Sequence, residues 1–204
     1  MADNLSDDEL HNLISAARES RAGVGPADTG GAAMSYDFRR PQQVNKDHAR
    51  RMENIHEQFA RLLAATMSSN MRQVVDVDLA FCDQLLYHEF ISSLPSPGSA
   101  YTFVMAPFGG QAILSIANEL VMAIIDRAFG GQGRSFVGSD DRTLTQIEMN
   151  IINKLASRMF ADLETTWEPV ARVETTEVGL ETNPEFIQIA APGDGCFVVA
   201  FEAN

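Results

Sequence analysis

The chain has few basic residues for its length of 204 residues. It contains 15 lysines and arginines against 28 aspartates and glutamates, which gives a formal net charge of −13 at pH 7. Proteins that bind nucleic acid need a basic surface to neutralise phosphates, and anionic membrane surfaces repel acidic proteins. The composition therefore argues against a nucleic-acid partner and against direct membrane binding. It favours a protein partner, or a basic patch on one.

Cysteines and long apolar runs are scarce as well. The two cysteines, Cys82 and Cys196, lie in apolar, strand-like stretches, and we interpret them as buried free thiols in a reducing compartment. The N-terminus is acidic and lacks the basic start and apolar stretch of a secretory signal. No window contains the ~18 consecutive apolar residues of a membrane span. We expect a cytoplasmic protein without direct membrane insertion, which reaches a membrane only through its partners.

Sequence signatures of metal or nucleophilic chemistry are also missing. The four histidines, His11, His48, His56 and His88, are scattered and have no metal-ligand spacing on one helix face. No nucleophile elbow is present. The glycine-rich stretch 130–133 is not followed by Lys-Ser or Lys-Thr, and it ends a predicted helix where a phosphate-binding loop would open one. We therefore expect no metal, no cofactor and no catalytic residues.

Three regions differ in composition. In residues 1–19, Ser6 and Glu9 have the spacing of a capping box, and apolar residues follow at the spacing of one helix face: Leu10, Leu13, Ile14 and Ala17. Residues 20–35 are rich in glycine and bury too little to order themselves. Residues 36–204 carry the alternating patterns of a globular body. The sequence therefore predicts a short amphipathic helix, a flexible linker and one folded domain.

The first half of this body mixes helical and strand periodicity. The patterns predict, in order, a long helix over about 45–68 with Met52, Ile55, Phe59, Leu62 and Leu63 on one face, a half-buried strand over 75–81, a short helix over 84–93, a hairpin of strands 100–106 and 111–117, and a helix that Asn118 caps and that runs to Phe129.

The second half repeats the order helix, strand, strand after about 100 residues. Thr145 and Glu148 form a second capping box. The long helix they open has its apolar residues at helical spacing: Ile147, Ile151, Leu155, Met159 and Phe160. Strands are predicted over 170–178, 186–190 and 196–203. Because the first copy continues with a further strand and a helix, we expect the chain to end inside its second repeat, with the domain incomplete at its C-terminal end.

Six short motifs, in a fixed order, make the body resemble a known family: YDFRRP at 36–41, IHEQFAR at 55–61, YHEFI at 87–91, IDRAFGGQG at 125–133, RTLTQIE at 142–148 and ETNP at 181–184. Together they resemble the flagellar motor switch family FliM. The resemblance implies an α/β domain of α+β type, a pseudo-twofold α/β/α fold similar to CheC and CheX, preceded by a flexible tether with a short amphipathic helix. It also implies a further C-terminal domain in full-length relatives, the domain that joins FliN, which is expected to be absent here.

The N-terminal segment resembles the part of the family that binds phosphorylated CheY. The resemblance implies that the contact residues are Leu5, Ser6, Asp7, Glu9, Leu10, Leu13 and Ile14. Physically, an acidic helix with one apolar stripe on a flexible tether suits recognition in a groove of a partner, and the tether keeps a captured regulator close to the body. The alternative is an ordinary N-terminal helix that packs on its own domain.

The glycine-rich stretch resembles the loop with which the family contacts the middle domain of FliG. The residues implied are Asp126, Arg127, Gly130, Gly131, Gln132, Gly133 and Arg134. Glycines allow positive φ and a close approach of backbone at such a contact, and the two arginines are placed to pair with acidic residues of the partner. The alternative is structural, because a glycine after a helix is commonly its C-cap.

An enzyme is the competing hypothesis, because CheC-type phosphatases share the fold. Their chemistry needs a Glu-x-x-Asn pair one helical turn apart on a long helix. The second long helix has Lys154 and Ser157 at the corresponding places, and the first has Glu53 and Glu57 without a matching asparagine. The chain's Glu-x-x-Asn lies at positions 9–12, in the tethered segment. We therefore predict a non-enzymatic protein; an unrelated α/β scaffold is a third hypothesis.

The function that the resemblance implies is that of a rotor component of the flagellar motor switch. Phosphorylated CheY is captured by the N-terminal helix and delivered to the domain, whose contact with FliG then shifts and changes the direction of rotation. Such a shift requires CheY to bind one rotor state more tightly than the other. Neighbouring FliM subunits are further expected partners, and FliN is expected only through the missing domain. The implied location is the cytoplasmic face of the inner membrane, within the flagellar basal body.

Overall fold

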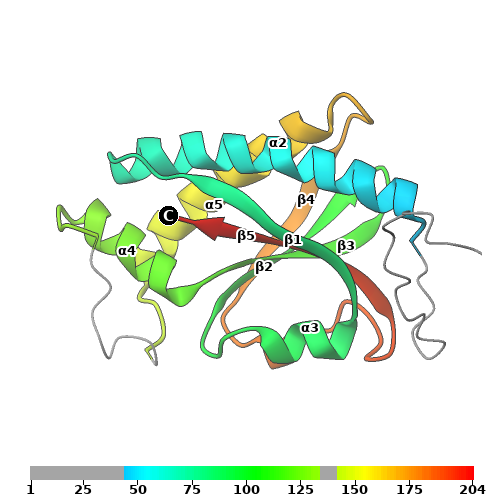
Figure 1. The fold of residues 1–204 in the computed structure, drawn as a ribbon. Helices are drawn as coiled ribbons and strands as arrows, with labels where there is room; N and C mark the ends of the chain where they lie inside the picture. The colour runs from blue at the N-terminus through cyan, green and yellow to red at the C-terminus, as the bar shows by residue number, and fades with distance from the viewer. Residues whose placement is uncertain (1–43, 134–141) are drawn as a thin grey trace, which may run out of the picture. The chain divides into compact units, whose positions relative to one another are not determined.

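A computed structural model of the chain describes residues 44–133 and 142–204, which belong to a compact unit spanning Gln42–Asn204. The predicted N-terminal helix and linker, and the first motif at 36–41, lie outside the described residues. The elements follow in the order α2 (Lys46–Met71), β1 (Val77–Leu86), α3 (Tyr87–Ser93), β2 (Ser99–Ala106), β3 (Gly110–Ile116), α4 (Asn118–Ala128), α5 (Gln146–Trp167), β4 (Glu174–Glu181), the 3-10 helix η1 (Pro184–Phe186) and β5 (Gly195–Ala203) (Figure 1).

The strands form two antiparallel sheets, one of β1 and β5 and one in the order β3-β2-β4. Each sheet joins the two halves of the chain, since Leu79 lies opposite Phe201 in the first and Tyr101 opposite Leu180 in the second. The first strand of each half therefore pairs with the second strand of the other half. This exchange is what an internal repeat with pseudo-twofold symmetry predicts, and it confirms the repeated helix-strand-strand order.

Two long antiparallel helices, α2 and α5, lie side by side against the sheets (Figure 1). The α2 N-terminus is capped by the Asn45 side chain, which accepts from the Asp47 amide. Along the shared flank, Thr66 donates to Asp162 at 2.6 Å, and one turn further Arg158 donates to Asn70 at 3.0 Å. From the first contact to the second, the residue number increases along α2 and decreases along α5. The two helices are therefore antiparallel.

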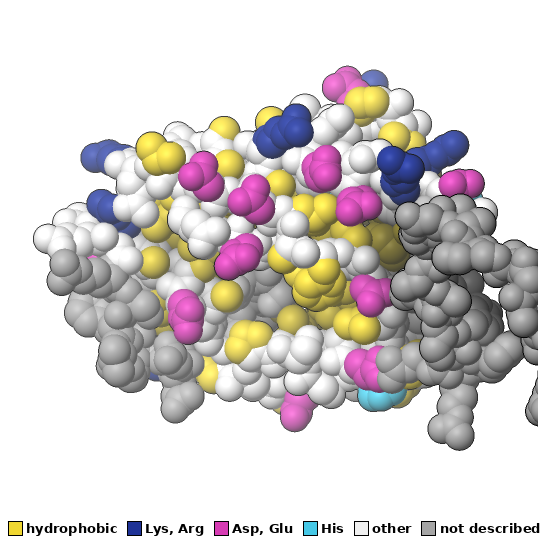
Figure 2. Space-filling model, viewed as in Figure 1, with side chains coloured by type: hydrophobic (Ala, Val, Ile, Leu, Met, Phe, Trp, Pro, Cys, Tyr) yellow, Lys and Arg dark blue, Asp and Glu magenta, His cyan; other side chains and the backbone are white. Residues whose placement is uncertain are grey.

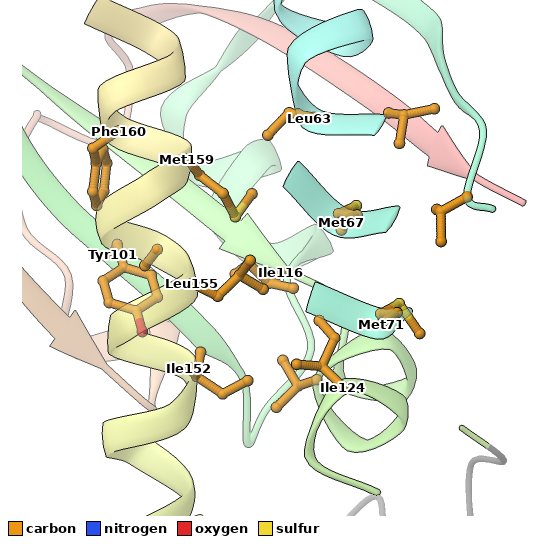
Figure 3. Packing of buried hydrophobic residues seen from close by; sticks show 14 of the residues in the cluster. Leu63, Met67, Met71, Tyr101, Ile116, Ile124, Ile152, Leu155, Met159 and Phe160 are labelled. Carbon is orange, nitrogen blue, oxygen red and sulfur yellow. The ribbon is translucent and has the colours of Figure 1, made fainter. Parts of the chain in front are cut away.

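The hydrophobic core lies between the helices and the sheets (Figure 3). Ile152 of α5 and Val121 of α4 are fully buried. Phe160 continues the core toward the second sheet, with its ring centroid 6.1 Å from that of Tyr101 and 4.9 Å from that of Phe103. In Figure 3 the side chains of Ile152, Leu155, Ile116 and Ile124 converge between α5 and the α2 and α4 ribbons. One core therefore supports both sheets.

The predicted hairpin is confirmed, and the predicted strand 75–81 is longer than expected. It begins at Val77 and continues to Leu86, so the predicted helix 84–93 begins only at Tyr87. The boundary falls there because the Glu89 side chain accepts from the Leu86 amide and caps the new helix. In the sequence Val75, Val77, Leu79 and Phe81 alternate with acidic residues, which predicts that Phe81 shares their buried face. It is instead 50% exposed, because an irregularity between Leu79 and Phe81 shifts the register there.

Three predictions for the second half of the chain differ from the structure. The predicted strand 186–190 is wrong: residues 184–186 form the 3-10 helix η1, which the Asn183 side chain caps. The Tyr87 hydroxyl donates to the Ile187 carbonyl at 2.8 Å, so a side chain takes a backbone group that a strand would use. The predicted strand 170–178 starts at Glu174, after a turn that closes α5. Ile147, expected in the core, is 65% exposed.

Three smaller predictions also differ from the structure. Asn118 is the first residue of α4 and not its cap; its side-chain amide donates to the Pro97 carbonyl and ties the helix start to the preceding loop. The long helix α2 ends at Met71, three residues later than expected. Cys82 and Cys196 are free, as predicted, but both are half-buried and not fully buried. Burial, the largest cause, and the nearby Glu53 and Glu57 raise the pKa of the Cys82 thiol.

Candidate protein-binding site

The C-terminus of α4 ends in two hydrogen bonds that define a Schellman motif. Phe129 is the C-cap, and Gly130 follows it with φ of 92°. The Gly130 amide donates to the Arg127 carbonyl at 3.0 Å, and the Gly131 amide donates to the Asp126 carbonyl at 2.8 Å. An L-residue rarely adopts this positive φ, so glycine is required at position 130. The structural interpretation of Gly130 as a helix cap is therefore confirmed.

The next two glycines of the loop fold back over the end of α4. The Gly133 amide donates to the Asp126 carboxylate at 2.8 Å, and Gly133 has φ of 75°. A Cβ added at Gly131 would overlap the same carboxylate, and one added at Gly133 would lie 2.9 Å from the Arg127 Nε. The Asp126 carboxylate thus holds the loop, and the Arg127 side chain packs closely against it, so a side chain at Gly131 or Gly133 would have to displace one of them.

Arg127 connects this loop to a different part of the chain. Its guanidinium donates to the Gln73 side chain in the turn between α2 and β1. Its Nε is buried and has no hydrogen-bond partner among the residues that the structure describes. The ends of α2 and α4 lie together at the left of Figure 1. Arg134, the other predicted arginine of the site, lies outside the described residues.

Sequence reasoning missed the exposed side chains around this loop. Val74, next to Gln73, is 83% exposed, and Phe129 is 66% exposed. Gln132 and Arg72 are exposed as well. A phenylalanine directly before Gly-Gly at a predicted helix end is the sequence signal that points to Phe129. We call the residues Arg72, Val74, Arg127, Phe129 and Gly130–Gly133 the glycine-loop surface.

The predicted capping box forms at the start of α5. Thr145 accepts from the Glu148 amide, while the Glu148 carboxylate accepts from Thr145 at 2.8 Å and from Arg142 at 2.8 and 2.5 Å. Arg142 also reaches Met122 Sδ of α4 at 3.8 Å. The hydrogen bonds from Arg142 are the main cause that lowers the pKa of Glu148 to about 2. This box therefore joins α5 to the helix that carries the glycine loop.

The residues at the places where a CheC-type phosphatase would carry its Glu-x-x-Asn pair lie on the solvent side of the two long helices. Lys154 and Ser157 are exposed on α5, and the Ser157 hydroxyl donates to the Asn153 carbonyl of its own helix. Glu53 and Glu57 are exposed on α2.

Within residues 44–133 and 142–204, no group of three or more His, Cys, Asp or Glu side chains is arranged to hold a metal ion. Nor does any helix of these residues have the length and apolarity to cross a membrane.

Comparison with known proteins identifies the family. The model of the family described as flagellar motor switch protein FliM matches residues 45–204. The chain belongs to the FliM family. The FliM protein of Treponema pallidum is 35% identical over all of this chain and 60% of its own length, and that of Borreliella burgdorferi is 33% identical over 97% and 53%. This FliM-family chain thus spans little more than half the length of these relatives.

Solved structures show the fold of this FliM-family domain. The match to a FliG-FliM complex from H. pylori has a TM-score of 0.75 at 33% identity and covers 79% of this chain and 87% of the matched one. The FliM middle domain from H. pylori matches with a TM-score of 0.71 at 31% identity, over 79% and 86%. FliY of Thermotoga maritima matches with a TM-score of 0.67 at 15% identity, a similarity of fold only. The predicted CheC/CheX-like α/β class is confirmed.

Proposed function

We propose that this chain is a rotor component of the flagellar motor switch that binds FliG through the glycine-loop surface. The observation that carries the proposal is the exposure of Phe129 and Val74 beside a loop whose Gly133 amide is held by the Asp126 carboxylate. Exposed apolar side chains on a rigid support are what a protein contact needs, because little flexibility is lost on binding. The similarity to a chain solved in a FliG-FliM complex supports the choice of partner.

The test is binding of the FliG middle domain to the Phe129→Ser variant, measured by titration calorimetry. We expect at least a tenfold loss of affinity, since truncation of a central apolar contact commonly has that effect. Phe186→Ser is the matched control, because Phe186 is 70% exposed at η1, far along the chain. Substitution of Gly130, Gly131 or Gly133 is a poorer test, because it also strains the loop. Equal losses in both variants, or none in either, would contradict the proposal.

The arginines of this surface add a charge requirement on the partner. Arg127 contributes a guanidinium beside the loop, and Arg72 lies at the end of α2. We propose that they, together with Arg134, pair with acidic residues of FliG. Replacing Arg72 by Ala should weaken FliG binding mainly at low salt, because exposed charge pairs are screened. Equal weakening at low and high salt would contradict a role for charge at this position.

We further propose that residues 1–19 bind phosphorylated CheY through an amphipathic helix and that residues 20–35 tether it to the body. The spacing of Leu10, Leu13 and Ile14 in an acidic context supports this assignment. A peptide of residues 1–20 should bind activated CheY in titration calorimetry, and a peptide with Leu10→Ala and Leu13→Ala should bind much more weakly. If the unaltered peptide shows no binding, this assignment fails while the FliG proposal remains.

In this proposal the domain acts by binding and not by catalysis, and captured CheY changes the direction of rotation by shifting the FliG contact. Its place is the cytoplasmic face of the inner membrane in the flagellar basal body, beside neighbouring FliM subunits, with FliN joined through a further C-terminal domain. The solvent-facing Lys154 and Ser157 in place of a Glu-x-x-Asn pair support a non-enzymatic role. Acceleration of phospho-CheY hydrolysis above its spontaneous rate would overturn that part.

A further inference from the structure

The ribbon of β1 and β5 has one face against α2 and one face directed away from it. Phe201 belongs to the inner face, because its ring centroid lies 5.6 Å from that of Phe59 in α2. Neighbouring residues of a strand alternate between faces. Val198, Ala200 and Glu202 of β5 therefore point away from α2.

The outer face continues onto β1 through the strand register. Phe81 pairs with Ala200, and Asp83 pairs with Val198. Opposite residues in an antiparallel pair share a face, so Phe81 lies beside Ala200 on the outer side, where it is 50% exposed. Apolar residues on both sides of β5 are typical of a strand that is covered on both faces, yet every residue from Cys196 to Phe201 is only half-buried.

Carboxylates surround this apolar strip. Asp78 lies directly opposite Glu202, and both are exposed. Asp76 lies two residues before Asp78, where its backbone pairs with that of Asn204, so it is on the same side. Asp83 lies beside Val198. Neither strand contains a lysine or an arginine, and the described residues form no ion pair with any of these four acids. Like charges placed directly opposite each other destabilise a sheet, so this arrangement is costly in the absence of cations.

Figure 2 shows the consequence on the surface. Apolar side chains gather below α2, over β1 and β5, with Asp and Glu side chains around them, and the Lys and Arg side chains of this view lie over α2 and toward the ends. We call the residues Asp76, Asp78, Phe81, Asp83, Val198, Ala200 and Glu202 the acid-rimmed face. Apart from the connection between α2 and β1, which carries both Val74 and Asp76, it lies on different elements from the glycine-loop surface.

We propose that the acid-rimmed face docks a cationic amphipathic helix of another protein. The apolar side of such a helix covers Phe81, Val198 and Ala200, and its lysines or arginines reach the carboxylates of Asp78 and Glu202. Charge complementarity selects this occupant. A second copy of the chain that presents the same face across a twofold axis would place acid against acid, and nucleic acid or an anionic membrane is repelled for the same reason.

The probe for this inference is a fluorescein-labelled synthetic helix of leucines and lysines, with the leucines on one face, titrated with the 204-residue chain and followed by anisotropy. The double variant Asp78→Asn, Glu202→Gln should bind it about tenfold more weakly at low salt and less distinctly at high salt. The control double variant Glu168→Gln, Glu174→Gln removes the same charge from exposed positions elsewhere and should change binding by less than about twofold. Amide exchange should show protection by the peptide in β1 and β5.

A second variant tests the apolar half of the contact. Phe81→Ser should weaken peptide binding with little dependence on salt, and Val198→Thr, which keeps the side-chain shape, serves if Phe81→Ser fails to fold. Phe129→Ser should leave peptide binding unchanged, so failure of the FliG proposal and failure of this one are distinguishable. Equal losses in the two charge variants, or no loss in either apolar variant, would overturn the inference. Self-association in sedimentation that Asp78→Asn, Glu202→Gln strengthens and Phe81→Ser abolishes would overturn it in favour of a second copy.

Discussion

The glycine-loop surface and the acid-rimmed face differ in charge and in how their backbones are held. The first has Arg72 and Arg127 beside exposed apolar residues, next to a loop that the Asp126 carboxylate holds through the Gly133 amide. The second has three carboxylates on two strands that are held by their mutual pairing, and a fourth, that of Asp76, directly before β1. A net charge of −13 describes only the second of them. Composition therefore predicts the average charge of a protein and not the charge of its binding surfaces.

The largest effect should come from the core, which supports both surfaces. Ile152→Ala removes a fully buried side chain and should lower the free energy of unfolding by about 2–5 kcal/mol. Urea unfolding followed by circular dichroism measures it. Ile147→Ala, on the same helix but 65% exposed, should change stability by less than about 0.5 kcal/mol. A smaller loss in the first variant than in the second would show that the packing of α5 differs from that described.

The loop should respond to a change that leaves the strands intact. Asp126→Ala removes the acceptor of the Gly133 amide and should cost about 1–2 kcal/mol, with faster amide exchange at Gly131 and Gly133. The control is Asp76→Ala, an exposed aspartate of the other surface. Exchange in β1 and β5 should be unaffected by Asp126→Ala. If the strands exchange faster as well, the two surfaces are coupled and the comparison between them fails.

These two surfaces also show what the sequence predicts and what it does not. The capping box of Thr145 and Glu148 and the glycine cap at Gly130 were predictable, because each depends on residues a few positions apart. The outward turn of Phe81 was not, because the irregularity beside it depends on pairing with β5, more than 100 residues along the chain. The same holds for η1, where the bond from Tyr87 to Ile187 spans 100 residues.

In the candidate site, too, the features that depend on neighbouring residues could be predicted and those that depend on distant residues could not. The motif at 125–133 pointed to the loop, and its glycine geometry could be anticipated from the residue type alone. The place of Val74 in the site could not be anticipated. Its neighbour Gln73 accepts a hydrogen bond from the Arg127 side chain, and these two residues are 54 positions apart. Ile147 shows the converse error, since helical spacing alone placed it in the core while the buried carboxylate of Glu148 took the inward position.

A smaller effect tests the carboxylates of the acid-rimmed face. Asp78→Asn removes one of two like charges that lie directly opposite each other and should raise the free energy of unfolding by about 0.2–1 kcal/mol at low salt. The gain should shrink at high salt, where repulsion is screened. Urea unfolding at two ionic strengths measures both. A loss of stability on neutralising Asp78 would mean that a cationic partner inside the chain already stabilises this charge.

The smallest expected effect is a pH dependence that arises beneath the β1–β5 ribbon. The His56 ring packs against Phe59, Trp167 and Phe201 and donates from Nδ1 to the Met52 carbonyl at 2.7 Å. Burial, the larger cause, lowers the pKa of His56 from its ordinary value near 6.5. At a pH between the lowered pKa of the folded chain and the ordinary value near 6.5, the unfolded chain binds more protons than the folded one. Stability is therefore fully present above about pH 6.5 and declines as the pH falls toward the folded pKa.

Urea unfolding between pH 7.5 and 5 isolates this group, because the contribution of Glu148 is lost only as the pH falls from its ordinary value of 4.5 toward about 2. His56→Phe keeps an aromatic ring in the cluster and should flatten the decline in this range. His48→Gln, which alters an exposed histidine of the same helix, should leave it unchanged. An unchanged slope in His56→Phe would assign the decline to another group. A flattened slope would show that the support beneath the acid-rimmed face is pH-sensitive, whereas the hydrogen bonds that hold the glycine loop involve no histidine among the described residues.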